Sequence, residues 1–410
     1  MNHNKNWSPE LDGLRGYASL WVLVGHICIL TRCNIPILSQ PGFGVDLFIL
    51  LSGFLMAKNY IERQDVEPWM SVKTVASFWT RRFFRIAPLY YVLLIVAFIF
   101  GETFGHYRDF IAMVWPETQT ETARYTDSTL PNILTHISFT FGFLPYYSFR
   151  TVLPDWSIGL EMQYYAIFPF IMMLVMVVGF VRMAIASIVL CVTAAFLFPT
   201  YLAAFPMPSM ILFKLPLFVS GMLLYKAVAE KSKIYVVVAL LSPLSAFLTG
   251  YFTSPIKMII ELMIISGMSI LLMPHSDKSP LKNIVSFAKK TLAIRFSQFL
   301  GDVSYSVYLL HLMIVIPVIG WLVQHDAYVQ FSPLVRMIVA AAIILPITYA
   351  IAINLFKYIE KQGIALGRRL IKQKKNQDKD NSLNNINVLR VSGDIISTIN
   401  ISTLYAFLPH

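Results

Sequence analysis

The sequence predicts an all-α polytopic membrane protein with about ten transmembrane helices and one extra short or re-entrant segment. Of its 410 residues, 57% are hydrophobic and only 13% are charged, whereas soluble domains have roughly 25% charged residues. The apolar residues fall in long runs, such as 86–100 and 164–181. A helix of about 20 apolar residues crosses a hydrocarbon core about 30 Å thick. The basic residues gather beside these runs, as topology signals do.

Eleven hydrophobic segments are candidates for crossing the bilayer. An odd number of spans would place the two termini on opposite sides of the membrane. The candidates lie near residues 14–31, 43–59, 86–104, 131–147, 157–179, 183–203, 209–228, 234–250, 256–273, 300–323 and 333–356.

The charges of the connecting loops decide the number of spans. If the N-terminus is cytoplasmic and 131–147 does not span, the cytoplasmic regions between Lys5 and Lys375 hold 24 of the 33 Lys and Arg residues, and the outer loops hold six. This asymmetry agrees with the positive-inside rule. A spanning 131–147 would instead put the basic stretches 282–290 and 367–375 outside. We therefore expect ten spans, cytoplasmic N- and C-termini, and a partly buried or re-entrant 131–147, whose polar residues suit a cavity lining.

The chain is expected to divide into a membrane domain, 1–372, and a polar cytoplasmic tail, 373–410, whose Asn, Asp and Lys content predicts disorder. The net charge of +11 could indicate a nucleic-acid partner. Positive-inside topology explains the basic residues, so we expect a lipid bilayer and no nucleic acid. The three cysteines give no disulfide framework, and no metal set accompanies Cys28 and Cys33.

The first span carries ionisable residues, which are costly inside a bilayer and face a protein interior or a water-filled cavity. Asp12 and Arg15 stand at its mouth, and His26 lies deep within it. Arg15 and His26 are eleven positions apart, about three helical turns, so they lie near one face and roughly 16 Å apart along the axis. Both side chains can therefore line the same intramembrane cavity. A His26 that simply bonds to a neighbouring helix is the alternative.

Arginines stand just before the third span, at positions 81, 82 and 85. Arg82 and Arg85 are three residues apart and share a helix face, so both guanidinium groups can bind one polyphosphate. Ordinary topology signalling explains them equally well.

The fifth span opens with a polar face. Glu161 lies about one turn inside the outer surface and shares a face with Ser157, four residues earlier. Glu161 can orient a histidine or a sugar hydroxyl, or it is a solvated interfacial carboxylate. Trp156 fits an interfacial aromatic belt better than a sugar-stacking platform.

Four other intramembrane groups have structural interpretations. Asp46, near the outer end of the second span, can cap or pack a helix as easily as serve the function. Lys214 and Glu261 can snorkel or pair, and His311 is interpreted as structural first.

Five segments together resemble the acyltransferase 3 family of integral membrane O-acyltransferases, and the resemblance runs to about residue 370. One departure is that the family often ends its last span with Glu-x-Pro, whereas residues 359–369 read IEKQGIALGRR. The segments are LDGLRG (11–16) with its Arg15-to-His26 spacing, GFGVDLFILLSGFL (42–55), RRFFRIAPLYY (81–91), WSIGLEMQYY (156–165) and SYSVYLLH (304–311).

The resemblance implies a cytoplasmic acyl-CoA donor, usually acetyl-CoA, and a sugar acceptor on a surface glycan, such as a lipopolysaccharide O-antigen or a lipid-linked carbohydrate. It places the protein in a bacterial inner membrane, with acyl-CoA as a co-substrate and no permanently bound cofactor or metal. It further implies that Arg15 and His26 are essential and that Arg82 and Arg85 bind the donor.

The expected chemistry needs a base for the acceptor hydroxyl and stabilisation of an oxyanion. His26 is expected to be that base or a covalent acyl carrier. Arg15 is expected to help Arg82 and Arg85 bind the donor, and Glu161 to orient His26 or the acceptor. Asp12, Asp46, Ser157 and Trp156 are assigned to acceptor binding or to structure. A transporter that uses intramembrane ionisable residues is the alternative, but carriers commonly contain internal repeats, and we detect none.

Overall fold

The computed structural model describes residues 8–276, 278–374 and 376–377, and this part of the chain is helical without strands. Eight of its helices are long and apolar enough to cross a membrane, which confirms the all-α polytopic prediction. These helices are α1 (Pro9–Leu30), α2 (Gly42–Glu62), α3 (Val72–Ile99), α7 (Trp156–Val178), α8 (Phe180–Leu197), α13 (Pro255–Leu272), α16 (Ser304–Leu322) and α18 (Pro333–Leu355).

The other two expected spans are occupied by shorter helices. These are α10 (Leu215–Glu230) and the run formed by α11 (Lys233–Leu241), η4 (Ser242–Leu244) and α12 (Ser245–Thr249). The connecting elements are α4 (Gly101–Val114), η1 (Pro116–Thr118), α5 (Ala123–Thr126), α9 (Pro199–Ala203), η3 (Ile211–Phe213), α14 (Leu281–Leu292), α15 (Arg295–Asp302) and α17 (Asp326–Val329).

The segment 131–147 does not form a spanning helix, as the loop charges predict. It forms the short α6 (Leu130–Ile137), then the 3₁₀ turn η2 (Thr140–Phe143). Asn132 and His136 of this segment are fully buried, and the His136 ring stacks on Phe141 with centroids 4.3 Å apart. Asn132 and His136 therefore face the protein interior, whereas Ser138 and Thr140 are exposed.

The last span does not stop at residue 355. A π-helical turn, η5 (Phe356–Glu360), follows α18, and the chain stays helical to Lys374. The expected tail, 373–410, lies almost entirely outside the described residues, and its disorder stays a prediction.

Helix boundaries follow local sequence signals. Pro255 and Pro333 open α13 and α18, where a missing N–H costs nothing. The preceding Ser254 accepts a hydrogen bond from the Lys257 N–H, which caps α13. Gly179 separates α7 from α8 with φ of 83°, a backbone region that side chains with a Cβ rarely enter.

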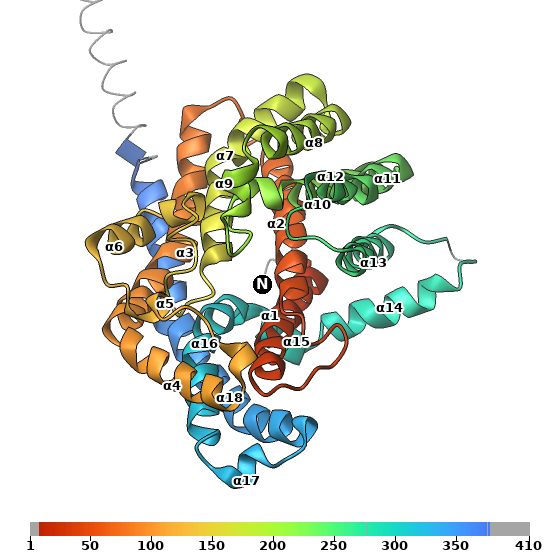
Figure 1. Ribbon diagram of the computed structural model, residues 1–410. Helices are drawn as coiled ribbons and strands as arrows, with labels where there is room; N and C mark the ends of the chain where they lie inside the picture. The colour runs from red at the N-terminus through yellow and green to blue at the C-terminus, as the bar shows by residue number, and fades with distance from the viewer. Residues whose placement is uncertain (1–7, 277, 375, 378–410) are drawn as a thin grey trace, which may run out of the picture.

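Two glycine contacts bring the central helices together. In Figure 1, α1 lies near the centre, and it packs against α2, α15 and α16. A Cβ at Gly16 of α1 would overlap the backbone of Gly301 in α15, and a Cβ at Gly53 of α2 would overlap the carbonyl of Phe218 in α10. Small residues thus permit the close backbone approach typical of membrane helices.

A buried ion triad ties α2 to α10 and α13. Lys214 Nζ lies 2.6 Å from Asp46 Oδ1 and 2.9 Å from Glu261 Oε1, and all three side chains are buried. Lys214 and Glu261 therefore pair, one of the two arrangements expected for them. The same geometry favours the packing role of Asp46, since its carboxylate is engaged by Lys214.

The triad gives a stability prediction. Lys214→Met should leave two carboxylates buried without their cation, and breaking a buried pair costs about 3–5 kcal/mol. We expect a strongly lowered unfolding temperature for the purified variant in detergent. Lys226→Met is the matched control, because Lys226 pairs with Glu230 at the surface, where a pair is worth about 0–1 kcal/mol. Equal unfolding temperatures for the two variants would contradict a stabilising triad.

The loop charges give a sidedness prediction. In a chain whose native cysteines are replaced, Ser286→Cys and Arg369→Cys should be shielded from a membrane-impermeant thiol reagent in intact cells, while Gln119→Cys should be labelled. All three positions are exposed, whereas neighbouring Val285 is buried and would be shielded on either side. Labelling at 286 in intact cells would overturn the expected topology.

Candidate active site

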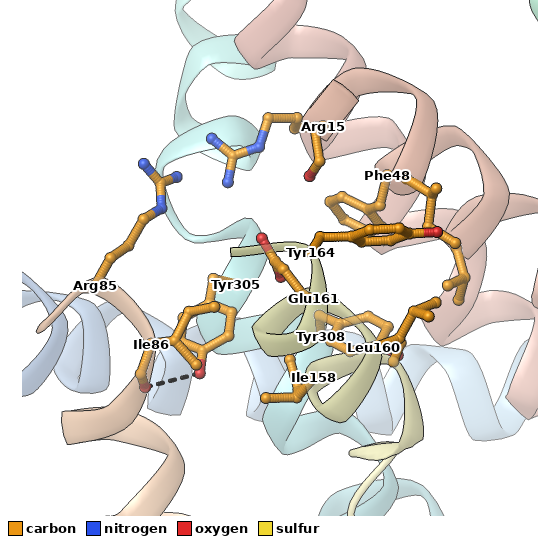
Figure 2. Close-up of a pocket in the computed structure, with 14 residues that line it drawn as sticks. Arg15, Phe48, Arg85, Ile86, Ile158, Leu160, Glu161, Tyr164, Tyr305 and Tyr308 are labelled. Atoms are coloured by element: carbon orange, nitrogen blue, oxygen red, sulfur yellow. Dashed lines mark hydrogen bonds between the residues drawn. The ribbon is translucent and has the colours of Figure 1, made fainter. Parts of the chain in front are cut away.

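A narrow cavity of about 70 Å³ lies among α1, α2, α3, α7 and α16. Figure 2 shows Arg15 and Arg85 extending toward one space, with the Glu161 carboxylate below them. Two wider cavities, of about 210 and 290 Å³, share Arg85 with it and are lined by Arg82 as well. Because they share lining residues, the three cavities adjoin one another, and the smallest lies deepest along α1 and α3. We call these adjoining cavities, lined by Arg15, Arg82 and Arg85, the arginine route.

Arg82 and Arg85 both face this route, as their spacing predicts. The Arg82 guanidinium lies over the rings of Phe78 and Tyr165, 5.5 and 5.3 Å from their centroids. Neither Arg82 nor Arg85 forms an ion pair within the described residues. Arg15 has only a distant pairing, 3.8 Å from Asp12. The positive charge of the route is therefore available to an anion.

Arg81, the third arginine of the cluster, has a structural role instead. It donates two hydrogen bonds to Glu67, of 2.9 and 2.7 Å, and Arg63 donates two more. Burial alone would raise the pKa of Glu67, but the bonds from Arg81 and Arg63 lower this pKa to about 2. The ionised Glu67 thus fixes Arg81 and the start of α3, which positions Arg82 and Arg85.

Two tyrosines of α16 form the inner wall of the narrow cavity. Tyr305 donates to the Ile86 carbonyl at 2.9 Å, the dashed line in Figure 2. Tyr308 donates to the Pro154 carbonyl at 3.0 Å and lies 2.5 Å from Ser157 Oγ. Sequence reasoning missed both tyrosines, although their spacing of three in SYSVYLLH places them on one helix face.

Sequence reasoning also missed Glu360. This buried residue ends the π-helical turn η5, and its Oε2 accepts a 2.9 Å hydrogen bond from Ser306. Arg85 and Arg15 are the cations that act on it electrostatically. The sequence feature that could have identified Glu360 is its position in IEKQG, directly after the long apolar run of the last span. π-Helical turns occur often at functional sites.

His26 and His311 form a hydrogen-bonded pair beyond the tyrosine wall. His26 Nδ1 lies 2.9 Å from the Val22 carbonyl and 3.1 Å from His311 Nε2. His311 Nδ1 lies 2.6 Å from the Tyr308 carbonyl. His311 is fully buried, whereas His26 is partly exposed. His311, interpreted from sequence as structural, is thus the direct partner of His26.

The predicted site residues divide into two groups. Arg15, Arg82, Arg85 and Glu161 line the cavities, together with Asp12 and Ser157. His26 does not line the narrow cavity; its partner His311 follows Tyr308 on α16, with the two ring centroids 6.0 Å apart. Trp156 is buried beside Ser157. In the described chain no hydrogen bond joins Glu161 to His26; Glu161 accepts one from Tyr165.

The described part of the chain brings three arginines to one set of adjoining cavities and pairs two histidines nearby on α1 and α16. Guanidinium groups bind phosphate through paired hydrogen bonds, and a histidine is suited to removing a hydroxyl proton. Within the described residues, no three His, Cys, Asp or Glu side chains come together as a metal site.

The chain is similar to several acyltransferases. It is 29% identical to peptidoglycan O-acetyltransferase OatA of Listeria monocytogenes over 102 residues, which are 25% of this chain and 15% of that protein. It is 29% identical to the putative membrane-bound transacylase BcsY of Komagataeibacter xylinus, over 47% of this chain and 44% of that protein. This chain thus spans less than half of either relative.

A putative acetyltransferase of Acidianus two-tailed virus, ORF330, is 25% identical over 331 residues, or 75% of this chain and 84% of that protein. No solved structure matches. The family described as "Acyltransferase domain" matches residues 8–353, a stretch that contains the arginine route, the tyrosine wall and the histidine pair. The chain therefore belongs to the acyltransferase 3 family of integral membrane acyltransferases.

Proposed function

We propose that this membrane acyltransferase moves an acyl group, most simply acetyl, from cytoplasmic acyl-CoA to a hydroxyl of a cell-surface or lipid-linked carbohydrate. The observation that carries the proposal is the route lined by Arg82, Arg85 and Arg15, whose smallest cavity is also lined by Tyr308. The Tyr308 carbonyl lies 2.6 Å from His311, which contacts His26. A polyphosphate head with a slender thioester arm matches both the charge and the taper of this route.

In this proposal the donor enters at the end of the route where Arg82 and Arg85 lie. Its phosphates contact Arg82 and Arg85, and the pantetheine arm passes Arg15 into the narrow cavity. His26 does not line this cavity, but Tyr308 does, and the Tyr308 carbonyl lies 2.6 Å from His311, the partner of His26. The arm must therefore displace Tyr308, or the acceptor must approach His26 from the other side of this wall.

His26 supplies the base. It removes the proton of the acceptor hydroxyl, the resulting oxygen attacks the thioester carbon, and the C–S bond breaks. The proton finally goes to the CoA thiolate, so the products are the ester and free CoA. Direct transfer and an acyl-histidine intermediate both fit this balance, and trapping of labelled acyl groups on His26 separates them.

The carbohydrate acceptor is supported by the name of one relative, a peptidoglycan O-acetyltransferase. Its hydroxyl would approach His26 from the outer side, whereas Ser157 and Glu161 line the cavity into which the donor arm is proposed to extend. The protein would then sit in a bacterial inner membrane with both termini cytoplasmic. A lipopolysaccharide O-antigen and a lipid-linked glycan are acceptors of this class.

The direct test uses purified protein in liposomes with radiolabelled acetyl-CoA and extracted glycans. His26→Ala should lower the rate of label transfer by roughly 10²–10⁴-fold, the usual contribution of a general base. His325→Ala is the matched control, because this exposed histidine lies far along the chain at the end of α16. Near-normal transfer by His26→Ala would remove His26 from the mechanism. Absence of transfer by the parent, with acetyl-CoA import instead, would favour a transporter.

A second prediction separates donor binding from chemistry. CoA phosphates are charged in both the ground and the transition state, so Arg85→Ala should raise the KM for acyl-CoA more than it lowers kcat. A charge-assisted bond is worth about 1.5–3 kcal/mol, so kcat/KM should fall roughly ten- to a hundredfold. Arg85→Lys should recover part of the loss, since lysine lacks the guanidinium fork.

Calorimetric binding of acyl-CoA provides the measurement, with Arg295→Ala as the control at an exposed arginine. If Arg82→Ala and Arg85→Ala bind acyl-CoA as tightly as Arg295→Ala, these arginines are topology signals.

A further inference from the structure

We propose that His311 is a positioning residue for His26: its Nε2 accepts the Nδ1–H of His26 and thereby holds His26 with an unprotonated Nε2 available to the acceptor hydroxyl. The role rests on the proposed function, because it concerns the base of that reaction. It is carried by the contacts of two side chains on different helices, α1 and α16.

The proton positions follow from the partners of each ring. A backbone carbonyl can only accept a hydrogen bond. His311 Nδ1, 2.6 Å from the Tyr308 carbonyl, must therefore carry a proton. A neutral imidazole has one protonated nitrogen, so His311 Nε2 bears a lone pair, and this lone pair faces His26 Nδ1 at 3.1 Å.

The same reasoning fixes the His26 tautomer. Its Nδ1 lies 2.9 Å from the Val22 carbonyl as well as 3.1 Å from His311 Nε2. Both neighbours are acceptors, so Nδ1 carries the proton, and its hydrogen bond is shared between them. The lone pair of neutral His26 is then on Nε2. This nitrogen has no hydrogen-bond partner within the described chain, and the His26 side chain is partly exposed.

The two acceptors act differently on the ring. The Val22 carbonyl is on the same helix, four residues earlier, and rotation about χ1 of His26 would break that bond. His311 approaches from α16, with the two ring centroids 4.8 Å apart and the planes inclined at 47°. It therefore limits the ring orientation from a second direction. His311 itself is fully buried and bonded through Nδ1.

A neutral orienting group also suits the membrane interior. Many catalytic histidines are oriented by a third group, but an isolated carboxylate in an apolar environment is costly to ionise. An imidazole accepts the same hydrogen bond without a net charge. When His26 takes the hydroxyl proton on Nε2, its Nδ1–H bond to His311 becomes charge-assisted and stronger, and the proton leaves Nε2 for the CoA thiolate.

The kinetic test compares His311→Phe with His311→Gln. Phenylalanine fills the ring volume without an acceptor, so kcat should fall roughly ten- to a hundredfold, the worth of a hydrogen bond to a charged group, while the KM for acyl-CoA stays unchanged. Glutamine places an amide oxygen near the Nε2 position and should restore part of kcat. A purely packing role would make glutamine no better than phenylalanine, and that result would overturn the proposal.

A spectroscopic test does not depend on turnover, and its main observation is made on the parent protein. In ¹⁵N-histidine-labelled full-length protein, solid-state NMR should show a scalar coupling across an N–H···N bond that links a protonated Nδ1 to an unprotonated Nε2. His26→Ala and His325→Ala samples assign it: only the first should lose the coupling. A parent protein that shows this coupling but transfers no acyl group would refute the proposed function and retain the pair. A His26 ring protonated on Nε2 would refute the pairing itself.

Discussion

The cost of placing charge in hydrocarbon organises this structure. An ionisable side chain in a span must be paired or must face an enclosed space, and each such group here has found one of these solutions. Lys214 is held between Asp46 and Glu261. Glu360 is buried against Ser306, with Arg15 and Arg85 as the cations that act on it. The close glycine contacts of α1 and α2 bring the helices near enough to enclose these groups.

The arginines of the route differ from these paired groups, because two of them have no ion-pair partner among the described residues. Glu67 occupies Arg63 and Arg81 through four hydrogen bonds, yet Arg82 and Arg85 remain without an ion pair in the described chain. Neighbouring arginines repel each other, and that arrangement is costly without an anion nearby. A ligand rich in phosphate would relieve this cost. The acyl-CoA donor that we propose carries phosphates of this kind.

Sequence reasoning predicted the parts of the molecule that local patterns determine. Hydrophobic run lengths predicted the long helices, and loop charges correctly excluded 131–147 as a span. The spacing of Arg82 and Arg85 predicted their common face. Contacts between residues of distant segments could not be predicted, because nothing in the sequence around Lys214 indicates that Asp46 is its partner. His311 was interpreted as structural for the same reason: its contact with His26, 285 residues away, depends on how α1 packs against α16.

Tyr308 contacts both parts of the proposed site, the arginine-lined cavities and the histidine pair. Its hydroxyl is fixed near Ser157 and the Pro154 carbonyl, and its own carbonyl holds His311. One residue thus lines the narrow cavity and supports the partner of His26. A donor arm that moves Tyr308 would act on the histidine pair at the same time, which would couple arrival of the thioester to the base.

The most direct measurement is a structure of the full-length protein in a lipid nanodisc with a non-hydrolysable acetyl-CoA analogue and a bound glycan acceptor. The account predicts phosphate density at Arg82 and Arg85, a pantetheine arm passing Arg15, and an acyl carbonyl carbon within about 4 Å of an acceptor hydroxyl that is hydrogen-bonded to His26 Nε2. Nucleotide density away from Arg82 and Arg85, or an acyl group separated from His26 by an unmoved Tyr308 in the complex with both ligands, would contradict it.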